Sequence, residues 1–139
     1  MMTEMRLMPR QPVMDKKDYS MSVISFKRLD WTDLVVSVVD MSPQGAGVEV
    51  EGRVDPGFVW FSDTVDGKKG GLLMWSKRLG SKYRGGIKFV PLSPDEEQRV
   101  QEKLAGSGPV KDPTVVVDTI LDSLKKSGAE SQWDPELNL

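Results

Sequence analysis

The 139-residue chain contains neither cysteine nor histidine. The missing cysteine excludes disulfides and thiolate nucleophiles, and the two absences together remove imidazole bases and nearly every kind of zinc site. Asp and Glu are then the available acids, and no pattern pairs them with a nucleophile or with a set of metal ligands. We therefore expect a protein that is not an enzyme and that holds no cofactor or metal.

Long apolar runs and strong basic charge are also missing. No run approaches the ~20 residues that span a bilayer, and residues 1–12 lack the apolar core of a signal peptide. We expect a cytoplasmic protein without membrane insertion. Residues 1–30 hold six Lys/Arg and four Asp/Glu, whereas residues 91–139 hold five and ten. This balance argues against a nucleic-acid partner, although local arginines can still receive one small dianion.

Hydrophobic periodicity between residues 20 and 92 predicts about six short strands at roughly ten-residue spacing, which is typical of a small antiparallel barrel or sandwich. Turns are predicted at Asp30–Asp33, Asp55–Gly57, Asp66–Gly67 and Leu79–Ser81. The expected strands are residues 20–28, 34–39, 47–52, 58–62, 71–76 and 83–92.

Two helices are predicted after the strands. The Ser93-Pro94-Asp95-Glu96 capping box begins the first helix, which ends near Gly106. A second helix begins at Asp112-Pro113, and its apolar stripe must be covered by the barrel, a second copy or a partner. We expect a mobile arm (1–18), a barrel with its helix (19–105), and a linker, extra helix and acidic tail (106–139). The stripe consists of Val117, Ile120, Leu121 and Leu124.

The stretch from Asp40 to Gly45 follows the pattern D-x-S-x-x-G. Taken alone, Asp40 and Ser42 followed by Gly45 form a plausible hairpin turn, since Asp and Ser cap turns and Gly adopts positive φ. The same residues can also form part of a binding site.

The surrounding sequence favours the second interpretation. "VVDMSPQGAGVEVE", followed by "GLLMWSKRLGSKYRGGIKFVPLSPDEEQRV", resembles a PilZ domain over about Tyr19 to Leu104. The resemblance implies a six-stranded antiparallel β-barrel closed by a C-terminal helix, and an all-β-dominated fold class with one additional C-terminal helix. It also implies a bacterial receptor for cyclic di-GMP, whose D-x-S-x-x-G ligands carry over to Asp40, Ser42 and Gly45.

The family's other motif, R-x-x-x-R, lies on the N-terminal arm. Arg6 and Arg10 match it, but 29 residues separate Arg10 from Asp40. Alignment back from the first strand instead places Lys17 at the second arginine position and Val13 at the first, so Lys16 and Lys17 are alternative arm ligands. Lysine cannot stack and fork as arginine does.

Three further features have two interpretations each. Trp75 is either a stacking surface for the ligand or a barrel core residue. The cations around the 79–81 turn form either a solvated loop or a contact for phosphate or a partner. Gly70-Gly71 and Gly85-Gly86 fit strand-edge or bulge positions. The cations are Lys77, Arg78, Lys82 and Arg84.

The resemblance implies a cyclic di-GMP receptor or adaptor, in motility or biofilm signalling, that orders its arm on ligand binding and signals to an effector protein. The alternative is a PilZ-like interaction adaptor that does not bind the nucleotide. The second C-terminal helix suggests a possible homodimer.

Overall fold

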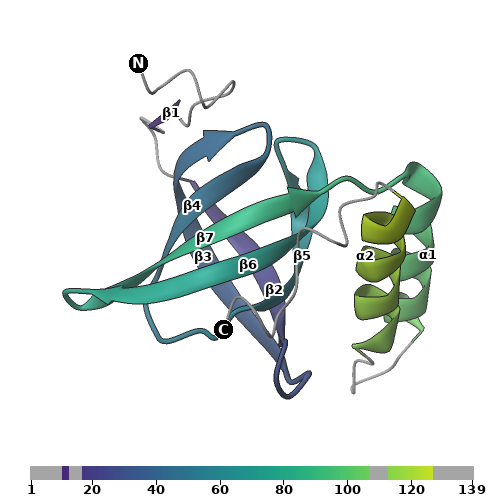
Figure 1. The fold of residues 1–139 in the computed structure, drawn as a ribbon, viewed down its shortest axis with the longest axis horizontal. Coiled ribbons are helices and arrows are strands. Elements are labelled where there is room, and N and C mark those ends of the chain that lie inside the picture. Colours follow the sequence, from purple (N-terminus) through teal and green to yellow (C-terminus); the bar gives the residue numbers. More distant parts are fainter. Residues whose placement is uncertain (1–10, 13–16, 107–112, 127–139) are drawn as a thin grey trace.

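A computed structural model describes residues 11–12, 17–106 and 113–126 of the chain (Figure 1). Seven strands and two helices follow one another along these residues. Neither helix is long and apolar enough to cross a membrane. The elements are β1 (Gln11–Pro12), β2 (Asp18–Ser25), β3 (Trp31–Ser42), β4 (Gly45–Val50), β5 (Gly57–Val65), β6 (Lys68–Leu79), β7 (Lys82–Val90), α1 (Pro94–Ala105) and α2 (Thr114–Lys126).

The strands β2 to β7 form a closed antiparallel barrel. Their order is β3-β2-β5-β6-β7-β4, and β3 also pairs with β4, which closes the ring. The short β1 pairs with the end of β3. The predicted six-stranded antiparallel barrel with two C-terminal helices is therefore confirmed. The Asp66–Gly67 hairpin turn is also confirmed, since both residues have positive φ.

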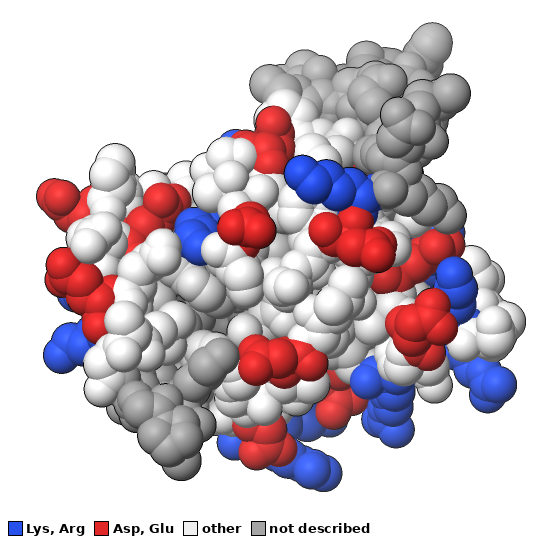
Figure 2. Space-filling view, turned by 180° about the vertical axis from the view of Figure 1, so that it is seen from behind, with Lys and Arg blue, Asp and Glu red and all other residues white. Residues whose placement is uncertain are grey.

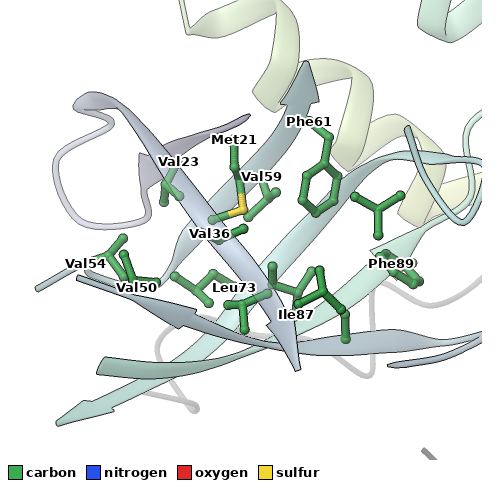
Figure 3. Close-up of a cluster of buried hydrophobic side chains, with 14 residues drawn as sticks. Met21, Val23, Val36, Val50, Val54, Val59, Phe61, Leu73, Ile87 and Phe89 are labelled. Carbon is green, nitrogen blue, oxygen red and sulfur yellow. The ribbon is translucent and has the colours of Figure 1, made fainter. Parts of the chain in front are cut away.

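The barrel interior is filled by one cluster of apolar side chains (Figure 3). Period-two alternation directs every second residue of a strand inward, as with Met21 and Val23 on β2. Phe61 and Phe89 meet edge to face at 6.5 Å between ring centroids. This cluster makes the barrel a packed core rather than a pore.

A second apolar cluster covers part of the barrel's outer surface. Ile24, Phe58 and Leu72 point outward from β2, β5 and β6, and the two helices lie over them (Figure 1). The predicted apolar stripe of the second helix is thus covered within the chain. The expected homodimer stays a prediction and would need a different surface of α2. The helical residues buried in this cluster are Val100, Val116, Ile120 and Leu124.

A capping box begins α1, and a polar contact joins this helix to α2. The Ser93 hydroxyl accepts from Glu96 N, and the Glu96 carboxylate accepts from Ser93 N at 2.8 Å, as the capping box predicts. Lys126 Nζ lies 3.4 Å from Glu96 Oε2. The end of α2 is therefore tied to the beginning of α1.

The turn predicted at Asp30–Asp33 is wrong. The chain turns at residues 26–30, where Leu29 N donates to Ser25 O at 2.8 Å, and β3 already begins at Trp31. Asp33 fits within this strand because its carboxylate accepts hydrogen bonds from Ser22 Oγ and Trp31 Nε1. Side-chain partners across the sheet therefore outweighed the turn preference of Asp.

Candidate functional site

A row of paired residues crosses the outer surface of four adjacent strands. Asp40 of β3 pairs with Gly47 of β4, Gly47 pairs with Gly86 of β7, and Gly86 pairs with Trp75 of β6. We call these four residues the transverse row. A carboxylate thus lies at one end of the row and an indole at the other, with two glycines between them.

Two single-residue β-bulges create this row. Val38 pairs with Val48 and Asp40 with Gly47, so Val39 is an extra residue on β3. Leu73 pairs with Ile87 and Trp75 with Gly86, so Met74 is an extra residue on β6. A bulge shifts the alternation by one residue, which turns both Asp40 and Trp75 to the outer surface. Trp75 is 45% exposed, so it is not a barrel core residue and its ring is accessible to a ligand.

The two glycines allow the end groups to lie over the strands. A Cβ on Gly86 would lie 2.2 Å from Trp75 Nε1, and one on Gly47 would lie 2.8 Å from both Asp40 carboxylate oxygens. Gly85 and Gly86 are both paired with β4 on one side and β6 on the other, so they lie neither at a strand edge nor at a bulge, and that interpretation is corrected. A glycine here leaves room for the side chain of the neighbouring strand.

Asp40 is held by contacts on both sides. Its Oδ1 accepts a hydrogen bond from Gly47 N at 3.1 Å, and its Oδ2 lies 3.8 Å from Arg84 Nη2. The side chains of Asp40 and Arg84 remain 26% and 32% exposed. The carboxylate is therefore oriented by its neighbours but still accessible from solvent.

Ser42 and Gly45 shape the hairpin turn next to the row. Ser42 Oγ accepts from Gln44 N at 3.2 Å, and Gln44 O accepts from Phe89 N at 2.7 Å. A Cβ on Gly45 would lie only 2.2 Å from Ile87 O, so the close approach of β4 to β7 requires glycine. The turn and its Ser42 cap are thus observed, but the positive φ expected at Gly45 is wrong, because Gly45 is the first residue of β4. Asp40 and Ser42 lie two residues apart on β3.

The N-terminal arm reaches the same strand. β1 pairs Pro12 with Asp40 and Gln11 with Met41. Since β4 occupies the other edge of β3 at these residues, β1 continues the edge that β2 occupies earlier. The arm therefore meets the motif strand through a β-ladder, whatever the number of residues between them.

Only one of the proposed arm ligands lies within the described residues. Lys17 O accepts from Val38 N at 3.3 Å, and Lys17 Nζ lies 5.3 Å from the centroid of the Tyr19 ring. Its ammonium group is thus engaged with Tyr19. The other arm candidates lie outside the described residues, namely Arg6, Arg10, Val13 and Lys16.

Sequence reasoning missed Lys88, and it named Arg84 only as one of four cations that could contact phosphate or a partner. Both lie on β7 two residues from Gly86, one on each side, so period-two alternation gives them the same outer face. Once this strand was predicted, the spacing Arg84-x-Gly86-x-Lys88 could have indicated that the three residues share one face. These two cations place positive charge beside Gly47 and Gly86, as an anionic ligand requires.

An open cleft of about 350 Å³ lies at the opposite end of β3. Its arginines are paired with carboxylates, with Arg28 4.0 Å from Asp30 and Arg53 3.5 Å from Asp55. Arg84 is paired with Asp40 in the same way, so what distinguishes the cleft is that none of the predicted site residues lines it. Within the described part of the chain, no group of three or more Asp or Glu residues is placed to hold a metal ion.

Neither a scan against protein-family models nor a search of curated proteins gives a significant match to this chain. The geometry of the transverse row and its surroundings therefore carries the functional argument.

Proposed function

We propose that this protein is a PilZ-like receptor for cyclic di-GMP that relays ligand binding to an effector protein. The observation that carries the proposal is the transverse row, which joins the motif residue Asp40 to the exposed ring of Trp75 across two glycines. A row of small residues with an aromatic group at one end and a carboxylate at the other suits a purine nucleotide.

Each part of the row matches a part of this ligand. An indole stacks on a guanine ring, and a carboxylate accepts from guanine N–H groups or holds an arginine in place. Arg84 and Lys88 supply cations for phosphate, and Gly47 and Gly86 allow close approach. The hydroxyl of Ser42 can donate to a phosphate or base edge.

The pairing of β1 with β3 supports participation of the arm. It brings Pro12 opposite Asp40, and Arg10 precedes this strand by one residue in the sequence. In the proposal Arg6 and Arg10 close over the ligand and order the arm, which produces the signal. Lys17 is the weaker candidate because its ammonium group lies over Tyr19.

Isothermal titration of the full chain with cyclic di-GMP tests the proposal, with cyclic di-AMP as the control ligand. We expect binding at micromolar concentration with favourable enthalpy for cyclic di-GMP only. The Arg6→Ala/Arg10→Ala variant should lose binding, and the matched Lys16→Ala/Lys17→Ala variant should keep it. Absence of binding heat with the unmodified chain would refute the proposal that it is a cyclic di-GMP receptor.

One observation favours the second candidate, a PilZ-like adaptor that does not bind the nucleotide. Asp40 already contacts Arg84 and Gly47 within the chain, so its carboxylate has partners without a ligand. If the titration shows no binding while Asp40→Ala lowers stability, Asp40 is a structural residue and the adaptor becomes the better proposal.

A further inference from the structure

The β6–β7 hairpin projects from the barrel on the side away from the helices (Figure 1). β5 pairs with β6 only as far as Gly57 opposite Leu73, and β4 pairs with β7 as far as Val50 opposite Tyr83. Among the described residues, the backbone of Met74–Leu79 is therefore paired with β7 alone. This segment, which we call the hairpin edge, has one row of backbone N–H and C=O groups that no described strand pairs with.

The side chains on the hairpin edge are apolar and cationic. Trp75, Lys77 and Leu79 share one face by period-two alternation, and Arg78 lies on the other. Trp75 and Leu79 are 45% and 53% exposed. No Asp or Glu occurs between Met74 and Lys88.

We propose that the hairpin edge binds an extended acidic segment of a partner protein, which adds a strand to β6. An added strand satisfies the open backbone groups. It also brings carboxylates opposite Lys77 and Arg78 and apolar side chains beside Trp75 and Leu79. Because Lys77 and Arg78 are consecutive, the partner needs two neighbouring acidic residues, one for each face. This inference does not rest on cyclic di-GMP binding, although both proposals use the exposed ring of Trp75.

Two other occupants fit the hairpin edge less well. A second copy pairing through the same edge would set Lys77 and Arg78 against cations of its own kind, which is unfavourable between paired strands. An anionic lipid surface can neutralise the cations but cannot supply alternating donors and acceptors in register with the backbone.

The same residues also protect the edge from unwanted pairing. Bulges and lysines commonly block edge-to-edge association, and the hairpin edge begins with the Met74 bulge and carries Lys77 and Arg78. A neutral or basic strand would leave these charges uncompensated. The residues that oppose aggregation therefore select an acidic strand.

Amide hydrogen exchange of the full chain, followed by NMR, tests the proposal with the synthetic peptide TTVEETVT. At saturation we expect exchange of the Met74–Leu79 amides to slow at least tenfold. The charge-reversed peptide TTVKKTVT and a TTVEETVT peptide with N-methylated backbone amides should each bind at least tenfold more weakly.

A charge swap provides the matched variant test. Lys77→Glu/Arg78→Glu should lose at least tenfold affinity for TTVEETVT and gain affinity for TTVKKTVT. Lys27→Glu/Lys125→Glu, which makes the same charge change at exposed positions elsewhere, should behave as the unmodified chain.

Three results would overturn the proposal. The first is equal binding of all three peptides. The second is binding without slower exchange at Met74–Leu79. The third is protection of these amides before any peptide is added, which would mean that another segment of this chain or a second copy already covers the edge.

Discussion

The outer surface of the barrel has two contrasting regions. Under the helices it is apolar, with Ile24, Phe58 and Leu72 completing the second core cluster. Away from the helices it carries the transverse row from Asp40 to Trp75. Strand β6 contributes to both regions, with Leu72 in the covered region and Trp75 in the open one. The bulge at Met74 lies between these two residues. One strand can therefore stabilise the fold and present a site within four residues.

The reverse face of the molecule carries charges of both signs. Figure 2 shows Asp and Glu side chains spread over the reverse face, interspersed with Lys and Arg. The part of this face made by described residues carries no continuous basic stripe. The β6–β7 hairpin contrasts with this face, since no Asp or Glu occurs between Met74 and Lys88.

The largest expected effect lies in the covered region. Ile120 is fully buried against the barrel, and Ile120→Ala should lower the free energy of unfolding by about 2–5 kcal/mol, because it leaves a cavity. Urea denaturation measures this loss. Asp118→Ala, on the exposed face of the same helix, should stay within about 0.5 kcal/mol. Equal losses for the two variants would contradict the packing of α2 described above.

A double-mutant cycle tests the open region. Gly86→Ala should lower the free energy of unfolding by about 1–3 kcal/mol, because the new Cβ meets the Trp75 ring. In a Trp75→Ala background the loss should shrink, with a coupling energy of about 0.5–3 kcal/mol. Thermal or urea unfolding of the four proteins gives this value. An identical loss in both backgrounds would mean that the ring does not lie over Gly86.

The helix contacts predict a pH dependence. The hydrogen bond from Ser93 N, supported by the contact with Lys126, holds the pKa of Glu96 below its ordinary value of 4.5, although burial opposes this. A carboxyl with a lowered pKa in the folded state stabilises the fold above its ordinary pKa, and this contribution is lost as the pH falls through the lowered value. Glu96→Gln should cost about 1 kcal/mol at pH 7 and progressively less below pH 4.5.

Urea denaturation between pH 7 and pH 3 checks this prediction. Asp118→Asn, on the exposed face of α2, serves as the control and should follow the unmodified chain. A Glu96→Gln variant whose deficit stays constant over the whole range would contradict the proposed linkage.

The smallest expected effect on stability separates binding from folding. Arg84→Ala removes a partly exposed ion pair and should cost at most about 1 kcal/mol in the free energy of unfolding. If the proposed function is right, it should still weaken cyclic di-GMP binding about tenfold, since one charge-assisted contact is lost. Titration and urea denaturation of Arg84→Ala measure the two quantities. Lys82→Ala, which removes the exposed contact with Glu51, should change neither.

Local signals in the sequence were sufficient for much of the fold. Alternation predicted the strands, the Asp66–Gly67 pair predicted its hairpin turn, and the capping box predicted the beginning of α1. Each of these signals lies within a few residues, where backbone preferences dominate. Their number and spacing left a barrel or a sandwich open, and the resemblance to PilZ domains favoured the barrel.

The composition of the site was less predictable than its motif. D-x-S-x-x-G identified Asp40 and Ser42, but the Arg84 contact joins residues 44 positions apart, and only the barrel's closure brings them together. The bulges at Val39 and Met74 have no signature in composition. Without them, period-two alternation would have turned Asp40 and Trp75 into the core.

The two bulges also bear on how such a surface can change through insertions and deletions. Deleting Met74 would let Trp75 follow Leu73 directly in the ladder, so Trp75, Lys77 and Leu79 would keep the outer face and Ser76 and Arg78 the other one. One codon gained or lost at a bulge can therefore leave the facing of every other residue of the strand unchanged. Position-by-position comparison of sequences would register this as a gap, although the residues on both sides of it keep their faces.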